Sequence, residues 1–228
     1  MKHFVSSTLL ACVIVTFAAC GGGDKTTAPE TFCTDTACVS EPIVVQSDAP
    51  GKPFVKITFK DCKIDSIISD KGGMGVINTI VFSDFIPNEI KPSKSLIKVD
   101  IIGSTHSWIR INDCATGRGY AIKLNFDKGI GKQKFTSALN NFDPKFKVAE
   151  GLIAYYDNTF IYVQDMETNK VAKALLTDTG ITEVIDYNDV HALIKDVDIT
   201  KEKILAHIHY QNKDIEVSKS LEFKDSEL

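Results

Sequence analysis

The chain has 228 residues, of which 43% are hydrophobic and 25% charged, and its formal net charge is −4 at pH 7. This composition is typical of a globular protein and excludes a collagen-like, a disordered or a coiled-coil chain. The excess of acidic residues gives no electrostatic reason to expect a nucleic acid or an anionic lipid surface as a partner.

The first 20 residues have the layout of a secretory signal peptide. Lys2 supplies a positive start, residues 4–19 are mostly apolar, and the small residues Ala18 and Ala19 come directly before Cys20. The apolar stretch of about 16 residues is shorter than the roughly 20 that a membrane-spanning helix needs. No later stretch is comparably apolar, so we expect no transmembrane segment.

Residues 17–20 (FAAC) resemble the lipobox of bacterial lipoproteins, in which the cysteine thiol is lipidated and the chain is cleaved in front of it. Phe17 stands where the family usually has leucine. The resemblance covers the leader only, and it implies a signal peptide at 1–19, a lipid-anchored Cys20 and a place in the cell envelope. Gly22, second after the anchor, favours the outer membrane. The alternative is an ordinary secreted protein cleaved at the same place.

Residues 20–39 are expected to form the lipidated cysteine and a flexible tether, because the sequence GGGDKTTAPE after Cys20 has no hydrophobic periodicity. A Gly-rich coil of about 12 residues spans roughly 19 Å. We therefore expect residues 40–228 to form a single β-rich domain close to the membrane surface.

Four cysteines lie outside the leader and the anchor: Cys33, Cys38, Cys62 and Cys114. An even number of cysteines in an exported chain favours disulfides over a zinc site, and no C-x-x-C pair occurs. The favoured pairing is Cys33–Cys38 and Cys62–Cys114, since Cys62 and Cys114 hold equivalent places in the repeat described below. The alternative is that Cys33 or Cys38 ties the N-terminal segment to the repeats.

Most of the remaining chain has the pattern of β-strands. Alternation and β-branched residues predict strands at 54–60, 96–102, 107–112, 119–125, 152–156, 159–164 and 203–210. Two groups of apolar residues have helical spacing instead: Phe135, Ala138, Leu139 and Phe142, and Val190, Leu193, Ile194 and Val197. We expect one or two short connecting helices there.

Three of the predicted strands end in one pattern: Ile, a polar or aromatic residue, an apolar residue, a polar residue and Asp. The aspartates, Asp61, Asp113 and Asp165, are spaced 52 residues apart. Each Asp is expected to start a hairpin turn, and Gly117 and Asn169 stand near the turn ends, where a positive φ suits them. Each copy of the repeat therefore predicts a hairpin.

Residues 152–175 resemble three consecutive strands of a β-propeller blade, similar to tryptophan–aspartate and kelch blades. The resemblance implies an all-β, mainly antiparallel fold. It would be a small β-propeller, or propeller-like blades, with a repeat period of about 52 residues. A β-sandwich whose hairpins use similar turns is the alternative.

One cluster of residues has the chemistry of a ligand site: His106, Trp108, Arg110, Arg118 and Tyr120. It contains the only tryptophan and both arginines of the chain. Arginine makes planar bidentate contacts, and Trp and Tyr rings suit sugars or an interface. The alternative is that Trp108 packs between sheets while Arg110 and Arg118 make cross-strand pairs.

A second pattern is His207-x-His209. Two residues apart on a strand, both rings point to one face and could take a metal ion. The histidine face is otherwise simply the solvated face of the strand, and the sequence places no third ligand nearby. We therefore expect no metal and no cofactor.

The sequence contains no G-x-S-x-G elbow and no phosphate-binding loop. It favours a lipid-anchored cell-envelope protein that acts as a non-catalytic binding or assembly module. Its expected partners are the membrane, through the anchor, and an envelope protein or glycan, but no nucleic acid. The alternative is an envelope hydrolase acting on glycans or peptides.

Overall fold

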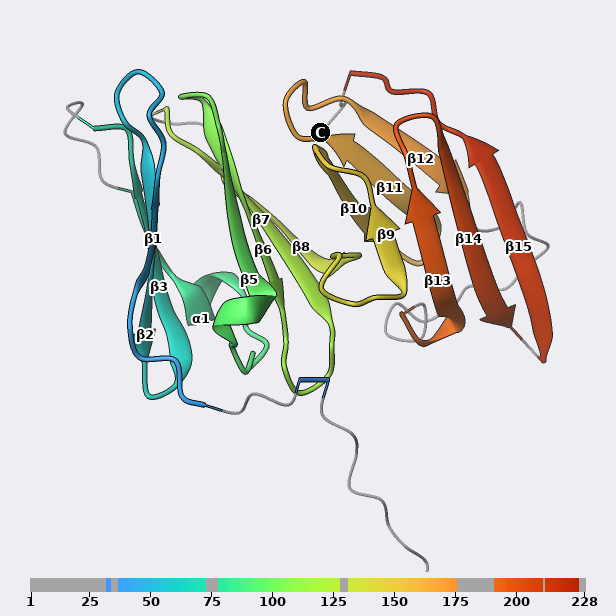
Figure 1. The fold of residues 1–228 in the computed structure, drawn as a ribbon, viewed down its shortest axis with the longest axis horizontal. Helices are drawn as coiled ribbons and strands as arrows, with labels where there is room; N and C mark the ends of the chain where they lie inside the picture. The colour runs from blue at the N-terminus through green and yellow to red at the C-terminus, as the bar shows by residue number, and fades with distance from the viewer. Residues whose placement is uncertain are drawn as a thin grey trace, which may run out of the picture. The chain divides into compact units, whose positions relative to one another are not determined.

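The computed structural model describes residues 32–33, 37–72, 78–127, 131–175, 191–210 and 212–225. The predicted signal peptide, Cys20 and most of the tether lie outside the described residues. The described part of the chain is an all-β fold of mainly antiparallel sheets, as predicted (Figure 1).

The first sheet has four antiparallel strands in chain order. They are β1 (Ile43–Gln46), β2 (Phe54–Lys60), β3 (Lys63–Asp70) and β4 (Asn78–Val81). The short helix α1 (Phe82–Phe85) and the 3₁₀ helix η1 (Lys94–Leu96) follow this sheet and lead to the next one.

The second sheet has seven strands in the order β12-β11-β10-β8-β7-β6-β5. They are β5 (Ile97–Ile102), β6 (His106–Asn112), β7 (Gly119–Asn125), β8 (Gln133–Ala138), β10 (Leu152–Tyr156), β11 (Phe160–Asp165) and β12 (Val171–Leu175). A single residue pair, Ala138 with Tyr155, joins β8 to β10. The second and third copies of the repeat thus lie in one sheet, and separate propeller blades are not confirmed.

The third sheet has four strands in the order β15-β14-β13-β9. They are β9 (Phe146–Val148), β13 (Ile194–Ile199), β14 (Lys203–Tyr210) and β15 (Lys213–Ser220). Strand β9 pairs with β13 in parallel, and the other pairs are antiparallel.

The seven-stranded sheet shares a core with each of its neighbours. Ile109 and Ile111 of β6 pack in one cluster with Ile57 of the first sheet. Val163 of β11 packs in another cluster with Ile204 of the third sheet. The opposite face of the same strands is therefore left for the residues that alternate with these, and it carries the candidate site described below.

The strand predictions are confirmed to within one residue at each end. Short helices are present, as predicted, but the places predicted for them are largely wrong. Phe135 and Ala138 lie in strand β8, and Ile194 and Val197 lie in β13. The register of β8 against β7 shifts between these two residues, and that of β13 against β14 shifts after Ile194. A register shift puts residues three apart on one face of a strand, which imitates helical spacing. Of the second group, Leu193 is helical, within residues 191–193, and Val190 lies outside the described residues.

The predicted hairpin turns are confirmed in the second and third copies of the repeat. The carboxylate of Asp113 accepts hydrogen bonds from the backbone N–H and hydroxyl of Thr116. Asp165 accepts the same two bonds from Thr168. Gly117 and Asn169 have φ of +77° and +63°, so each turn ends on a residue that tolerates the left-handed region.

Two disulfides join Cys33 to Cys114 and Cys38 to Cys62, with Cα–Cα distances of 5.1 and 4.8 Å. The favoured pairing of Cys33 with Cys38 and of Cys62 with Cys114 is wrong. The turn that carries Cys62 belongs to the first sheet and the turn that carries Cys114 to the second, so equivalent places in the repeat are separated in space. The alternative is confirmed, because both bridges tie the N-terminal segment to a turn of the repeats.

Two disulfides are typical of a protein that folds in an oxidising compartment outside the cytoplasm. Among the residues that the structure describes, no helix is long and apolar enough to cross a membrane.

Candidate functional site

Five aromatic rings form a continuous row, the aromatic stack, on one face of the seven-stranded sheet. They are Trp108 on β6, Phe135 on β8, Tyr155 on β10, and Tyr162 and Phe160 on β11. Successive ring centroids are 5.8, 4.1, 5.1 and 5.6 Å apart in that order.

The alternation of each strand places the aromatic stack on this face. Trp108 lies between Ser107 and Ile109, and Ile109 faces the core shared with the first sheet. Tyr155 and Tyr162 are directly opposite each other in the β10–β11 register. Successive side chains of a strand point to opposite faces of the sheet. A strand with bulky residues at both its odd and its even positions is therefore covered on both faces.

Four of the five rings are stacked face to face, and Phe160 is tilted by 56° against Tyr162. The interplanar angles are 26° between Trp108 and Phe135, 29° between Phe135 and Tyr155, and 12° between Tyr155 and Tyr162. Trp108 and Tyr155 are buried, whereas Phe135, Phe160 and Tyr162 are half-buried. Between the stacked rings, the edges, which carry partial positive charge, are the parts left for other contacts.

A lysine lies over the ring at each end of the stack. Nζ of Lys123 is 5.8 Å from the centroid of Trp108, and Nζ of Lys173 is 4.7 Å from the centroid of Phe160. Neither lysine has a carboxylate within ion-pair distance among the described residues. Burial lowers the pKa of Lys123, because a partly desolvated cation without a counter-ion is disfavoured.

Three buried donor groups at this face have no hydrogen-bond partner among the described residues. They are Nε1 of Trp108, Nε of Arg110 and the hydroxyl of Tyr155. A buried polar group left unpaired costs about 1–3 kcal/mol. One buried acceptor of the same face, Oε1 of Gln164, also lacks a partner among the described residues, so the unpaired donors outnumber the unpaired acceptors.

The carboxylates of this face already have partners. Asp100 lies 2.7 Å from Nη2 of Arg110 and 3.4 Å from Nζ of Lys98. Asp157 accepts a 2.8 Å hydrogen bond from the hydroxyl of Tyr162. Burial, together with that bond and the charge of Asp157, raises the pKa of Tyr162 to about 12, so this hydroxyl stays protonated.

The residues of the predicted cluster around Trp108 do not all lie on one face of the sheet. Arg110 shares its face with Trp108, but Tyr120 packs into the core on the opposite face. Nε of Arg118 donates to the carbonyl of Thr136 at 2.8 Å. The cluster is therefore not one site.

His106 is buried, and its two ring nitrogens lie 2.8 Å from Oγ1 of Thr105 and 2.7 Å from the carbonyl oxygen of Met166. Burial lowers its pKa, so the neutral ring is favoured and a structural role fits it best.

Sequence reasoning found Trp108 but missed Phe135, Tyr155 and Tyr162. The repeat itself offered a signal, because Trp108 and Phe160 are equivalent residues 52 positions apart. Two equivalent aromatic residues on neighbouring hairpins lie on the same face when the hairpins share a sheet. That the hairpins do share a sheet depends on the pairing of β8 with β10, which no local pattern reveals.

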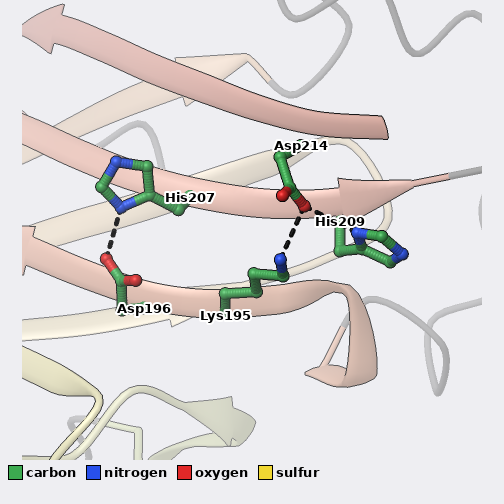
Figure 2. Close-up of polar contacts among 5 residues, drawn as sticks. All are labelled: Lys195, Asp196, His207, His209 and Asp214. Atoms are coloured by element: carbon green, nitrogen blue, oxygen red, sulfur yellow. Dashed lines mark hydrogen bonds and ion pairs between the residues drawn. The ribbon is translucent and has the colours of Figure 1, made fainter. Parts of the chain in front are cut away.

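His207 and His209 pair with different carboxylates, as Figure 2 shows. Nδ1 of His207 is 2.6 Å from Oδ1 of Asp196, and Nδ1 of His209 is 2.7 Å from Oδ1 of Asp214. Lys195 also donates to Asp214, at 2.6 Å. The described residues contain no group of three or more His, Cys, Asp or Glu that could hold a metal ion.

His207 makes stability depend on pH in a defined direction. The hydrogen bond to Asp196, with the charges of Asp196 and Glu216, raises the pKa of His207. The pair therefore stabilises the fold below the unfolded pKa of about 6.5, and this stabilisation is lost as pH rises through the folded pKa. We expect His207→Gln to lower the free energy of unfolding at about pH 5.5 and to have no effect near pH 9. Urea unfolding at both pH values measures this, and equal losses at both would contradict it.

Comparison with known proteins gives no match. No protein-family model matches the chain, and no curated protein and no solved structure is significantly similar to it. The function proposed next therefore depends on the chemistry of the aromatic stack and its two lysines.

Proposed function

We propose that the protein is a lipid-anchored binding module of the cell envelope, and that it binds its ligand on the face that carries the aromatic stack. The lipobox-like residues 17–20 support an anchor at Cys20, with the outer membrane as its location. The two disulfides support export. In this proposal the sheets pack in pairs, as in a β-sandwich, and hold the binding face rigid.

The observation that carries the proposal is the aromatic stack with an unpaired lysine at each end. Aromatic side chains supply large contact areas at low conformational cost and are enriched in interfaces. Phe135, Phe160 and Tyr162 are only half-buried. They are therefore the rings that a ligand would reach first.

The polar groups of this face favour binding over hydrolysis. Hydrolysis of a glycan needs a carboxylic acid and a second carboxylate that are free to act on the substrate. Asp100 is held by Arg110, and Asp157 accepts a hydrogen bond from Tyr162. Neither carboxylate is free for that chemistry.

Photo-cross-linking in cells tests the proposed binding face. We expect p-benzoylphenylalanine in place of Phe160 to form a covalent adduct with an envelope component on irradiation. The matched control places the same amino acid at Val44, which is 58% exposed in the first sheet, and should give none. The absence of an adduct at position 160, or equal adducts at both positions, would refute the proposal.

A further inference from the structure

We infer that the ligand of this face is an acidic polysaccharide, bound across the strands along the aromatic stack with its carboxylates at Lys123 and Lys173. The inference rests on the proposed function, since it assumes that this face binds a ligand, and it adds the chemical class of that ligand.

The charges of this face favour an anionic ligand. The strand registers place Lys98, Arg110, Lys123, Lys173 and Asp100 on the same side of the sheet as Trp108 and Tyr162. Asp100 neutralises the pair that it contacts, Arg110 and Lys98. The two remaining cations are unpaired within the described residues, although the chain as a whole has a net charge of −4.

The distance between the two lysines favours a chain-like ligand. Lys123 lies on β7 and Lys173 on β12, and three strands (β8, β10 and β11) lie between them. Neighbouring strands are about 4.8 Å apart, so the lysines are roughly 19 Å apart along the sheet surface. A single small anion cannot contact both, whereas a chain with repeated acid groups can.

The surface between the lysines favours oxygen acceptors. Stacked rings present edges of partial positive charge. Three of the unpaired buried groups of this face, on Trp108, Arg110 and Tyr155, can donate a hydrogen bond, and one, Oε1 of Gln164, can only accept. A sugar chain with carboxylates and hydroxyls offers acceptor oxygens at every residue. These oxygens suit a surface of positive ring edges and unpaired donors.

An acidic peptide fits the same face less well. An extended peptide brings a backbone N–H donor at nearly every residue and needs acceptors in return. The carboxylates of this face, Asp100 and Asp157, already accept bonds from the protein. A hydroxyl can instead act as the acceptor and turn its own proton to water.

Titration calorimetry with the full purified chain at low ionic strength tests the inference. The probes are an oligogalacturonate, a neutral cello-oligosaccharide of equal length and polyglutamate. We expect binding of the oligogalacturonate alone, and Lys123→Gln and Lys173→Gln should each weaken it about tenfold. Lys203→Gln, an exposed lysine on the third sheet, is the matched control and should leave the Kd unchanged.

Three outcomes would overturn the inference: equal binding of the neutral oligosaccharide, stronger binding of polyglutamate, or no binding of any probe. In each case, an adduct from position 160 in cells would still support the proposed binding face. A failed cross-link together with failed titrations would reject both.

Discussion

Replacement of Trp108 by alanine is expected to lower the free energy of unfolding by about 3–5 kcal/mol, the usual cost of removing a large buried aromatic side chain. Trp108 is 0% exposed. It packs against Phe135 and Lys123 on the face opposite the core shared with the first sheet. No other aromatic ring in the stack is as fully buried, so the loss should be the largest of the five.

The substitution Trp108→Phe distinguishes the effect of the aromatic ring on stability from the effect of the indole N–H group. The substitution keeps an aromatic ring but removes the unpaired Nε1–H group, and that removal offsets part of the lost volume. We expect a loss below about 1.5 kcal/mol. Phe160→Ala, at the equivalent half-buried position of the next repeat, should cost about 1–2 kcal/mol. Urea unfolding of the three variants measures these values. Equal losses for Trp108→Ala and Phe160→Ala would contradict the burial described for the stack.

Removal of either disulfide is expected to destabilise the protein strongly. The Cys33–Cys114 bridge spans 81 positions and the Cys38–Cys62 bridge spans 24. In the chain-entropy description, bridges of these spans contribute about 4.5 and about 3.4 kcal/mol. The double variants Cys33→Ser/Cys114→Ser and Cys38→Ser/Cys62→Ser should therefore lose stability in that order.

The connectivity can be checked independently of stability. Peptide mapping of the oxidised protein should recover Cys33 linked to Cys114 and Cys38 linked to Cys62. The single variant Cys33→Ser should leave a free thiol at Cys114, which a thiol-specific reagent labels after unfolding. A free thiol at Cys38 in that variant would instead restore the pairing of Cys33 with Cys38.

The strands could be predicted from the sequence because a strand with a solvated or differently packed second face shows a period of two. The turns could also be predicted, because the carboxylate of Asp113 and the missing side chain of Gly117 act locally within the turn. No local pattern in the sequence marks the two register shifts. These shifts place Phe135 on the same face as Ala138, and Ile194 on the same face as Val197. Residues three apart on one face imitate helical spacing.

The disulfide pairing and the aromatic stack depend on contacts between distant parts of the chain. Cys62 and Cys114 are equivalent in the repeat but lie in different sheets, so sequence equivalence misled the pairing. The stack depends on one residue pair, Ala138 with Tyr155, which joins the second hairpin to the third in a single sheet. Neither spacing nor propensity specifies such a pairing.

The composition of the adduct formed from position 160 tests the central claim most directly. Mass spectrometry of the cross-linked product should show sugar increments with the mass of uronic acid residues, attached at position 160 and absent from the control with the photoreactive residue at position 44. An adduct made of peptide, or the same adduct from both positions, would contradict the claim that the aromatic stack and its two lysines bind an acidic polysaccharide.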